Sequence, residues 1–143
     1  MQEIVEELIK RNKTISTMES CTGGHIVDAI TNIEGSSAIL KFSAVTYSNE
    51  YKIKMGVDPN VIEKYSVYSM ETAHEMAKNI SKYTNSNIGI GITGKLNRAD
   101  KRNNFGKDND KFYNKEITAL DSNRKTNKDY ILDTVVSIMK EVL

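Results

Sequence analysis

The feature that most constrains this chain is a strand-like stretch that passes through a glycine turn directly into a helix-like stretch. Residues 14–18 have the β-branched content of a short strand, and residues 25–33 have the apolar spacing of a helix. The run Glu19–Gly24 joins them, and its two glycines allow a sharp turn and a close approach of the backbone to a ligand. This order of elements favours an α/β layered domain.

Helices and strands are predicted to alternate along most of the chain. Apolar periodicity predicts further helices over about 4–11, 59–64, 70–80 and 128–142, and strands over 42–47 and 88–92. The helical side chains expected to face inward are Ile4, Val5, Leu8, Ile9, Ile26, Ala29, Ile30, Ile33, Met70, Ala73, Met76, Ala77, Ile80, Ile131, Thr134, Val135, Ile138 and Val142. Isoleucine and glycine alternate over 88–92, so one face of that strand should let a helix pack closely.

The composition changes sharply after Gly94. Residues 95–115 are mostly Lys, Arg, Asp and Asn, so we expect a long exposed polar loop there, within a single domain that spans 1–143. Residues 112–120 could contain one more strand.

Length, composition and charge limit the kinds of function that the chain can have. With 143 residues, 38% hydrophobic content and a net charge of +1, the chain is typical of one soluble globular domain without a bias toward nucleic acid or an anionic membrane. Its apolar runs fall short of the ~20 residues of a membrane helix. One cysteine excludes an internal disulfide, and the two histidines lack metal-ligand spacing, so no metal or cofactor is expected. A cytoplasmic location is the default expectation.

Two potential nucleophiles, Ser20 and Cys21, lie side by side in the glycine turn. The first amides of the following helix lack internal partners and carry partial positive charge, so they could hold a phosphate or an oxyanion. A serine nucleophile also needs a base. His25 should point away from the strand end, which leaves Lys52, just beyond the second strand, as the candidate base. If the two strands are parallel neighbours, their carboxyl ends share one edge, and Tyr47 could relay or orient a desolvated Lys52.

The spacing alone also fits plainer interpretations. A serine before two glycines is typical of a helix cap with a tight turn, and a single thiol at an element boundary is usually only buried. Lys52 could be a solvated surface lysine, and Tyr47 a packing residue of its strand.

Several motifs in order nevertheless resemble one family. They are Glu19–Gly24, Gly35–Ser37, Val45–Glu50 with Lys52, Gly56–Val57 and Gly91–Gly94. Together they resemble the C-terminal domain of the CinA family, also called the competence/damage-inducible protein family. The resemblance covers about residues 4–94, with a weaker match to the final helix.

The resemblance implies a three-layer α/β/α sandwich with a mostly parallel, mixed sheet, usually in a homodimer. Catalytic members of the family hydrolyse nicotinamide mononucleotide to nicotinic acid mononucleotide and ammonia, without a metal. The family's nucleophile falls on Ser20, and its tyrosine and lysine partners fall on Tyr47 and Lys52. Its substrate-binding positions fall on Cys21, Thr22, Gly23, Gly24, Asn49, Thr93 and Gly94, with the glycine turn supplying backbone donors.

The chain departs from the family pattern after Gly94. Family members continue into a loop of the form Gly-x-Ala-Gly-Pro-Gly-Gly, whereas this chain has Lys95–Asp100 there. The replaced loop supports an alternative in which the domain is a catalytically weak or inactive nucleotide-binding module. Cations that could partly compensate by binding a phosphate are Lys95, Arg98, Lys101 and Arg102, although a charge run usually only solvates a loop.

Overall fold

The fold is seen in a computed structural model that describes residues 1–96, 101–108, 111–118 and 123–143. Its helices are α1 (Gln2–Lys10), α2 (His25–Thr31), α3 (Asn49–Lys54), α4 (Pro59–Tyr65), α5 (Met70–Thr84) and α6 (Arg124–Val142), with a 3-10 turn η1 (Ser36–Ala38). Its strands are β1 (Ile15–Glu19), β2 (Leu40–Val45), β3 (Ile88–Thr93), β4 (Lys101–Asp108) and β5 (Lys111–Thr118).

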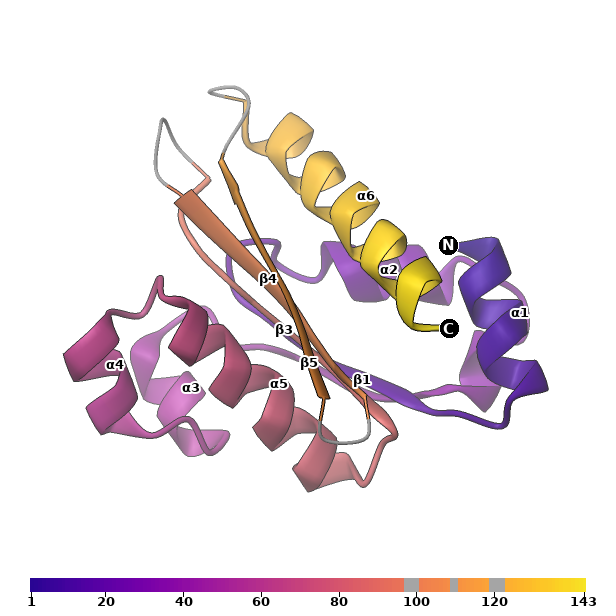
Figure 1. The fold of residues 1–143 in the computed structure, drawn as a ribbon, viewed down its shortest axis with the longest axis horizontal. Helices are drawn as coiled ribbons and strands as arrows, with labels where there is room; N and C mark the ends of the chain where they lie inside the picture. Colours follow the sequence, from indigo (N-terminus) through magenta and orange to yellow (C-terminus); the bar gives the residue numbers. More distant parts are fainter. Residues whose placement is uncertain (97–100, 109–110, 119–122) are drawn as a thin grey trace.

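The strands form one mixed sheet in the order β2-β1-β3-β4-β5. Strand β1 pairs in parallel with both β2 and β3, whereas β3–β4 and β4–β5 are antiparallel. Helices α3, α4 and α5 cover one face of the sheet, and α1, α2 and α6 cover the other (Figure 1). The predicted α/β/α sandwich is therefore confirmed, and the parallel pairing brings the carboxyl ends of β1 and β2 to one edge.

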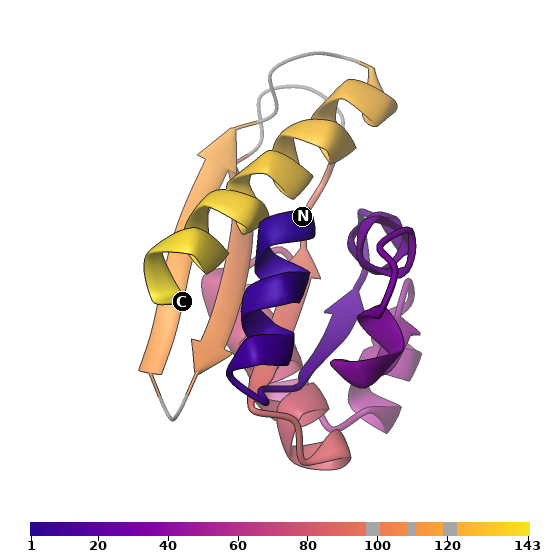
Figure 2. The same ribbon diagram turned by 90° about the vertical axis from the view of Figure 1, so that its right-hand side faces the viewer.

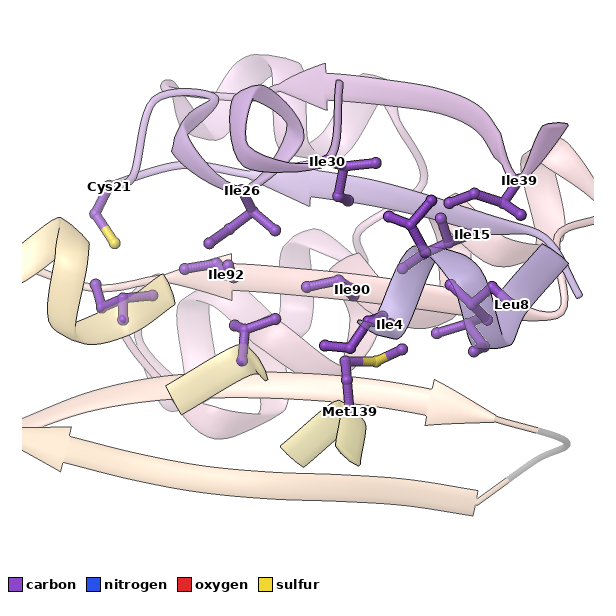
Figure 3. Close-up of a cluster of buried hydrophobic side chains, with 14 of the residues drawn as sticks. Ile4, Leu8, Ile15, Cys21, Ile26, Ile30, Ile39, Ile90, Ile92 and Met139 are labelled. Atoms are coloured by element: carbon purple, nitrogen blue, oxygen red, sulfur yellow. The ribbon is translucent and has the colours of Figure 1, made fainter. Parts of the chain in front are cut away.

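The main core lies between the sheet and the α1, α2 and α6 layer. Figure 2 shows α1 and α6 side by side over the sheet. Isoleucines 88, 90 and 92 of β3 and side chains of the three helices fill this layer, and Cys21 lies at one end of the cluster (Figure 3). Burial of this apolar surface is the main force that holds the C-terminal helix against the rest of the domain.

The opposite face of β3 carries Gly89 and Gly91, as the alternation predicts, and α5 packs directly against this face. A methyl group added at Gly89 would come within 2.1 Å of the Ala77 carbonyl oxygen, and one at Gly91 within 2.3 Å of the Ala73 carbonyl oxygen. Contacts this short with helix backbone leave no room for any side chain, so both positions require glycine for packing.

Most predicted elements are confirmed, with shifted ends. Strand β1 runs one residue past the predicted end, so Glu19 closes the strand. Helix α6 begins at Arg124 rather than near 128, because the Asn123 side chain caps it by accepting from the amides of Lys125 and Thr126 at 2.9 and 3.3 Å. Ile9 was expected to face inward but is 43% exposed.

The prediction of a polar loop over 95–115 is wrong for residues 101–108 and 111–115, which form β4 and the start of β5. Strand pairing is made by backbone groups, so a polar composition does not prevent it. The further strand expected within 112–120 is confirmed up to Thr118. Residues 97–100, 109–110 and 119–122 of these predictions lie outside the described residues.

None of the helices within the described ranges is long and apolar enough to cross a membrane.

Candidate active site

The two strand ends bring Ser20 and Lys52 together. Ser20 follows the last residue of β1, and Lys52 lies in the last turn of α3, a helix that the sequence analysis did not predict. The helix begins because the Ser48 side chain accepts a hydrogen bond from the Tyr51 amide at 3.3 Å. In this position Lys52 Nζ donates to Ser20 Oγ at 2.9 Å and to the Thr46 carbonyl oxygen at 2.7 Å.

Lys52 is one of the most buried large side chains in the protein, with 1% of its surface exposed. Burial lowers the pKa of its amine, and the neighbouring Cys21 partly opposes this shift. No carboxylate in the described part of the chain forms an ion pair with Lys52. Burial therefore favours the neutral form of the amine, which is the form that can accept a proton from Ser20.

The sequence analysis suggested that the amides at the start of α2 could bind an external anion. In the structure, two of these amides instead donate to a carboxylate of the chain itself. Glu19 is fully buried, and its carboxylate accepts from the amides of Ile26 and Val27 at 3.1 and 2.9 Å. It also accepts from the Thr22 hydroxyl at 2.6 Å. The carboxylate therefore neutralises the helix N-terminus internally and fixes the turn that carries Ser20.

The two glycines of this turn allow its backbone conformation. Gly23 and Gly24 have φ angles of 65° and 95°, a region that other residues rarely adopt, and the Gly23 amide donates to the Ser20 carbonyl at 3.0 Å. His25 is not part of the described lining of the cavity around Ser20, and its Nε2 lies 2.9 Å from Asp129 Oδ1 on α6.

A cavity of about 250 Å³ opens over the Ser20–Lys52 pair. This volume is just below the ~300–1,000 Å³ of typical small-molecule pockets. Its described lining consists of Ser20, Cys21, Tyr47, Asn49, Lys52, Val67, Tyr68, Thr93, Gly94, Lys95, Leu96 and Arg124.

Tyr47 lies at the rim of this cavity rather than at its floor. Its side chain is 64% exposed, and its hydroxyl accepts a hydrogen bond from Arg124 at 3.2 Å. The Thr46 carbonyl, not the Tyr47 hydroxyl, is the second partner of the Lys52 amine. A catalytic role for Tyr47 therefore stays a prediction, and the structure gives it a contact that sequence reasoning had not foreseen.

The structure gathers most of the predicted site residues around the cavity. Ser20, Cys21, Tyr47, Asn49, Lys52, Thr93 and Gly94 line it, whereas Thr22, Gly23 and Gly24 do not. Sequence reasoning missed Val67, Tyr68, Leu96 and Arg124, and named Lys95 only as a loop cation. Arg124 is 77 residues from Tyr47, so local spacing carries no signal for that contact.

The fold and this cavity define an α/β protein with a buried serine–lysine pair at the carboxyl edge of its parallel strands. The model of the CinA C-terminal domain matches residues 1–104, and the chain belongs to that family. The family resemblance of the sequence motifs is thereby confirmed.

Relatives and solved structures agree with this assignment. Proteins named as competence-damage inducible from Alkaliphilus oremlandii and Clostridium botulinum (strain ATCC 19397 / Type A) are 47% and 46% identical over 96 residues, or 66% of this chain. The chain spans only 23% and 24% of their lengths.

A CinA superfamily protein from Escherichia coli has the same fold, with a TM-score of 0.93 at 21% identity over 99% of this chain and 87% of that chain. The competence/damage inducible protein CihA from Agrobacterium tumefaciens gives 0.84 at 26% identity over 99% of this chain and 92% of that chain. The shared fold therefore includes the described residues after 104, where the match to the family model ends.

Proposed function

We propose that this chain is an amidohydrolase that converts nicotinamide mononucleotide to nicotinic acid mononucleotide and ammonia. The observation that carries the proposal is the 2.9 Å hydrogen bond between the buried Lys52 amine and the Ser20 hydroxyl, at the cavity that the family resemblance assigns to the substrate. A neutral lysine within hydrogen-bond reach is a general base of the kind that a serine nucleophile needs.

In the proposed reaction, Ser20 Oγ attacks the carboxamide carbon while its proton passes to Lys52 Nζ. The tetrahedral intermediate collapses, the C–N bond breaks, and Lys52 returns the proton so that ammonia leaves. Water then attacks the acyl-serine ester, giving up a proton to Lys52, and the carboxylic acid product leaves as Ser20 regains its hydrogen. The Thr46 carbonyl holds the amine in place through these proton transfers, because it binds a second N–H.

The rest of the cavity offers contacts to the nucleotide. Thr93, Asn49 and Gly94 lie along its wall, and Arg124 places a cation at the rim, where a phosphate could be bound. The Thr22 hydroxyl is already bonded to Glu19, so this residue could reach a substrate only through its backbone. We further propose that the protein works as a cytoplasmic homodimer on a small-molecule substrate, without a nucleic-acid or membrane partner.

Ser20→Ala tests the nucleophile directly. The variant keeps the turn and the fold but removes the attacking oxygen, so release of ammonia and nicotinic acid mononucleotide should fall at least a thousandfold. A loss of less than about tenfold would remove Ser20 as the nucleophile.

A second candidate is a nucleotide-binding module with little or no turnover. It is favoured by the capping of α2 by Glu19, which removes two amide donors that could have stabilised an oxyanion. Calorimetric binding of nicotinamide mononucleotide without product formation would support the module over the hydrolase.

A further inference from the structure

Thr46 carries a buried hydroxyl that the reaction proposed above does not use. The residue is 2% exposed, and its Oγ1 has no hydrogen-bond partner among the described residues. Most buried side-chain hydroxyls are hydrogen-bonded, because loss of water without a replacement partner is unfavourable. This hydroxyl therefore lowers the stability of the fold unless it gains a partner when the protein acts.

The strand register places this hydroxyl on the same side of the sheet as the serine–lysine pair. Val45 lies opposite Glu19 in the parallel pairing of β1 and β2, and the Thr46 amide donates to the Glu19 carbonyl at 2.8 Å. Thr46 and Ser20 are the next residues along the two strands, so the alternation of side chains directs both to the face opposite to Glu19. The Glu19 side chain binds α2, and the other face is covered by α3, the helix that carries Lys52 (Figure 1).

The same residue already binds the Lys52 amine through its backbone. Lys52 Nζ donates to the Thr46 carbonyl oxygen at 2.7 Å and to Ser20 Oγ at 2.9 Å. Covalent geometry keeps a threonine hydroxyl within about 5 Å of its own carbonyl oxygen, so Thr46 Oγ1 is close to the amine. Rotation about χ1 of Thr46 moves the hydroxyl among three staggered positions without displacing the carbonyl.

Proton transfer raises the number of N–H groups on this amine from two to three. A neutral lysine has two N–H groups and a lone pair, whereas its ammonium form has three N–H groups and no acceptor. The bonds to Ser20 and to the Thr46 carbonyl account for two of the three. A buried, charged N–H group without an acceptor disfavours the ammonium, because it has lost water without a replacement. The protonated form of Lys52 therefore requires a third acceptor.

We propose that Thr46 is a positioning residue whose hydroxyl accepts the third N–H group of Lys52 whenever the amine is protonated, as it is after proton transfer from Ser20. The inference rests on the proposed function for that transfer, but the bond to the ammonium forms with or without a substrate. The Thr46 hydroxyl keeps its own proton throughout. When Lys52 returns its proton to the departing ammonia, the amine is neutral again and the hydroxyl is released.

The other charged or titratable groups near the amine stay the same in every variant of Thr46. Cys21 lies beside Lys52 and opposes the lowering of its pKa, and the described lining of the cavity includes no carboxylate. The remaining charged or titratable side chains of that lining are Tyr47, Tyr68, Lys95 and Arg124. A change in the Lys52 pKa on substitution of Thr46 is therefore assigned to the hydroxyl.

Thr46→Val tests the hydroxyl with little other change, because valine keeps the backbone carbonyl and the branched shape. Thr46→Ala removes the same oxygen and replaces the valine variant if that one does not fold. Thr46→Ser is the matched variant that keeps a hydroxyl. Thr134→Val is the control for loss of a buried threonine hydroxyl elsewhere, since Thr134 is 4% exposed and bonds the Tyr130 carbonyl on α6.

Nuclear magnetic resonance titration of the Lys52 amine gives its midpoint in each full-length variant, and assays with nicotinamide mononucleotide give kcat and KM. Thr46→Val should lower the midpoint by about one pH unit, because the ammonium loses an acceptor. It should also lower kcat about tenfold with KM nearly unchanged. Thr46→Ser and Thr134→Val should leave the midpoint within a few tenths of a unit of that in the unsubstituted chain.

The stability of the fold should respond in the opposite sense to activity. At a pH above the Lys52 midpoint the amine is neutral, and urea unfolding should show Thr46→Val to be at least as stable as the unsubstituted chain, since the unpartnered hydroxyl is gone. A Lys52 midpoint that is unchanged or raised in Thr46→Val would overturn the proposal, whatever the effect on stability. An equal shift in Thr46→Ser would do the same.

The titration and the assay separate this inference from the proposed function. A lowered midpoint in Thr46→Val, without any ammonia release by the unsubstituted chain, would refute the hydrolase but leave the bond between Thr46 and the ammonium intact. Turnover that depends on Ser20 and Lys52, with a midpoint insensitive to Thr46, would refute the inference alone.

Discussion

The floor and the rim of the cavity hold two hydrogen-bonded pairs of opposite character. At the floor, Lys52 and Ser20 are 1% and 7% exposed, and the amine is held by two partners. At the rim, Tyr47 is 64% exposed and bonded to Arg124, which comes from the far end of the sequence. Burial lowers the pKa of the Lys52 amine at the floor, so it can serve as a base, whereas Arg124 at the rim is exposed to solvent.

In the proposed mechanism, the chemical step and the binding of the substrate would therefore depend on different parts of the structure. The floor depends on two adjacent parallel strands and the short helix α3. The rim depends on α6 and on the segment after β3. Variants of the floor should therefore act mainly on kcat, and variants of the rim mainly on KM.

Lys52→Met should have a larger effect on activity than any variant of the rim. Removal of the base should lower kcat by about a hundredfold to ten-thousandfold with little change in KM, because general-base catalysis contributes that much. Steady-state assays of nicotinamide mononucleotide hydrolysis measure both constants. The floor would lose its assigned role if kcat stayed within a few-fold of the unsubstituted chain.

The pH dependence should sharpen the assignment of the base. The pKa of Lys52 is lowered by burial, and only its neutral form accepts a proton. We expect kcat/KM to rise about tenfold per pH unit below that pKa and to level off above it. A profile that falls as the pH rises over this range would show that a protonated group, and not a neutral amine, is required.

The burial of Lys52 should also make the free energy of unfolding depend on pH. Because the pKa of Lys52 is lower in the folded than in the unfolded chain, the unfolded state binds more protons between the two values, and folding stability rises with pH across that window. Relative to Lys52→Met, the unsubstituted chain should gain up to ~1.4 kcal/mol per unit of pKa difference as the pH approaches ~10.4. Urea unfolding of both chains from about pH 7 upward measures this difference; parallel curves would contradict it.

The smallest effect is expected at the rim. Tyr47→Phe removes a hydroxyl that bonds Arg124 and leaves the floor intact. A role confined to the rim predicts that KM rises less than about tenfold with kcat nearly unchanged, since one exposed hydrogen bond contributes ~0.5–1.5 kcal/mol. A fall in kcat beyond a hundredfold would instead place Tyr47 in the proton transfer and remove the distinction between floor and rim.

Sequence reasoning could predict the elements whose signals are local. The alternation of isoleucine and glycine in β3 predicts the close approach of α5. The sequence analysis placed Ser20 near Lys52 on the condition that β1 and β2 are parallel neighbours, which they are. The structure brings the Lys52 amine within 2.9 Å of the Ser20 hydroxyl, although helix α3, which carries Lys52, was not predicted.

The remaining features depend on contacts that spacing does not encode. The polar composition of β4 and of the start of β5 is typical of a loop. These strands form because their backbones pair, which the composition does not show. The Glu19 carboxylate accepts from the amides of Ile26 and Val27 because the turn folds α2 back onto the end of β1. Arg124 and Leu96 reach the cavity through the packing of α6 and of the segment after β3, both remote in sequence from Ser20.

The protonation state of the floor amine can be measured without any substrate. Selective labelling of the lysine ε-carbons, with Lys52→Met to assign the signal, allows the Lys52 amine to be titrated by nuclear magnetic resonance in the folded chain. The structure predicts a midpoint clearly below the ~10.4 of an ordinary lysine, with the neutral amine bonded to Ser20. A midpoint at or above ~10.4 would mean that Lys52 stays charged beside Ser20, and the proposed base would not exist.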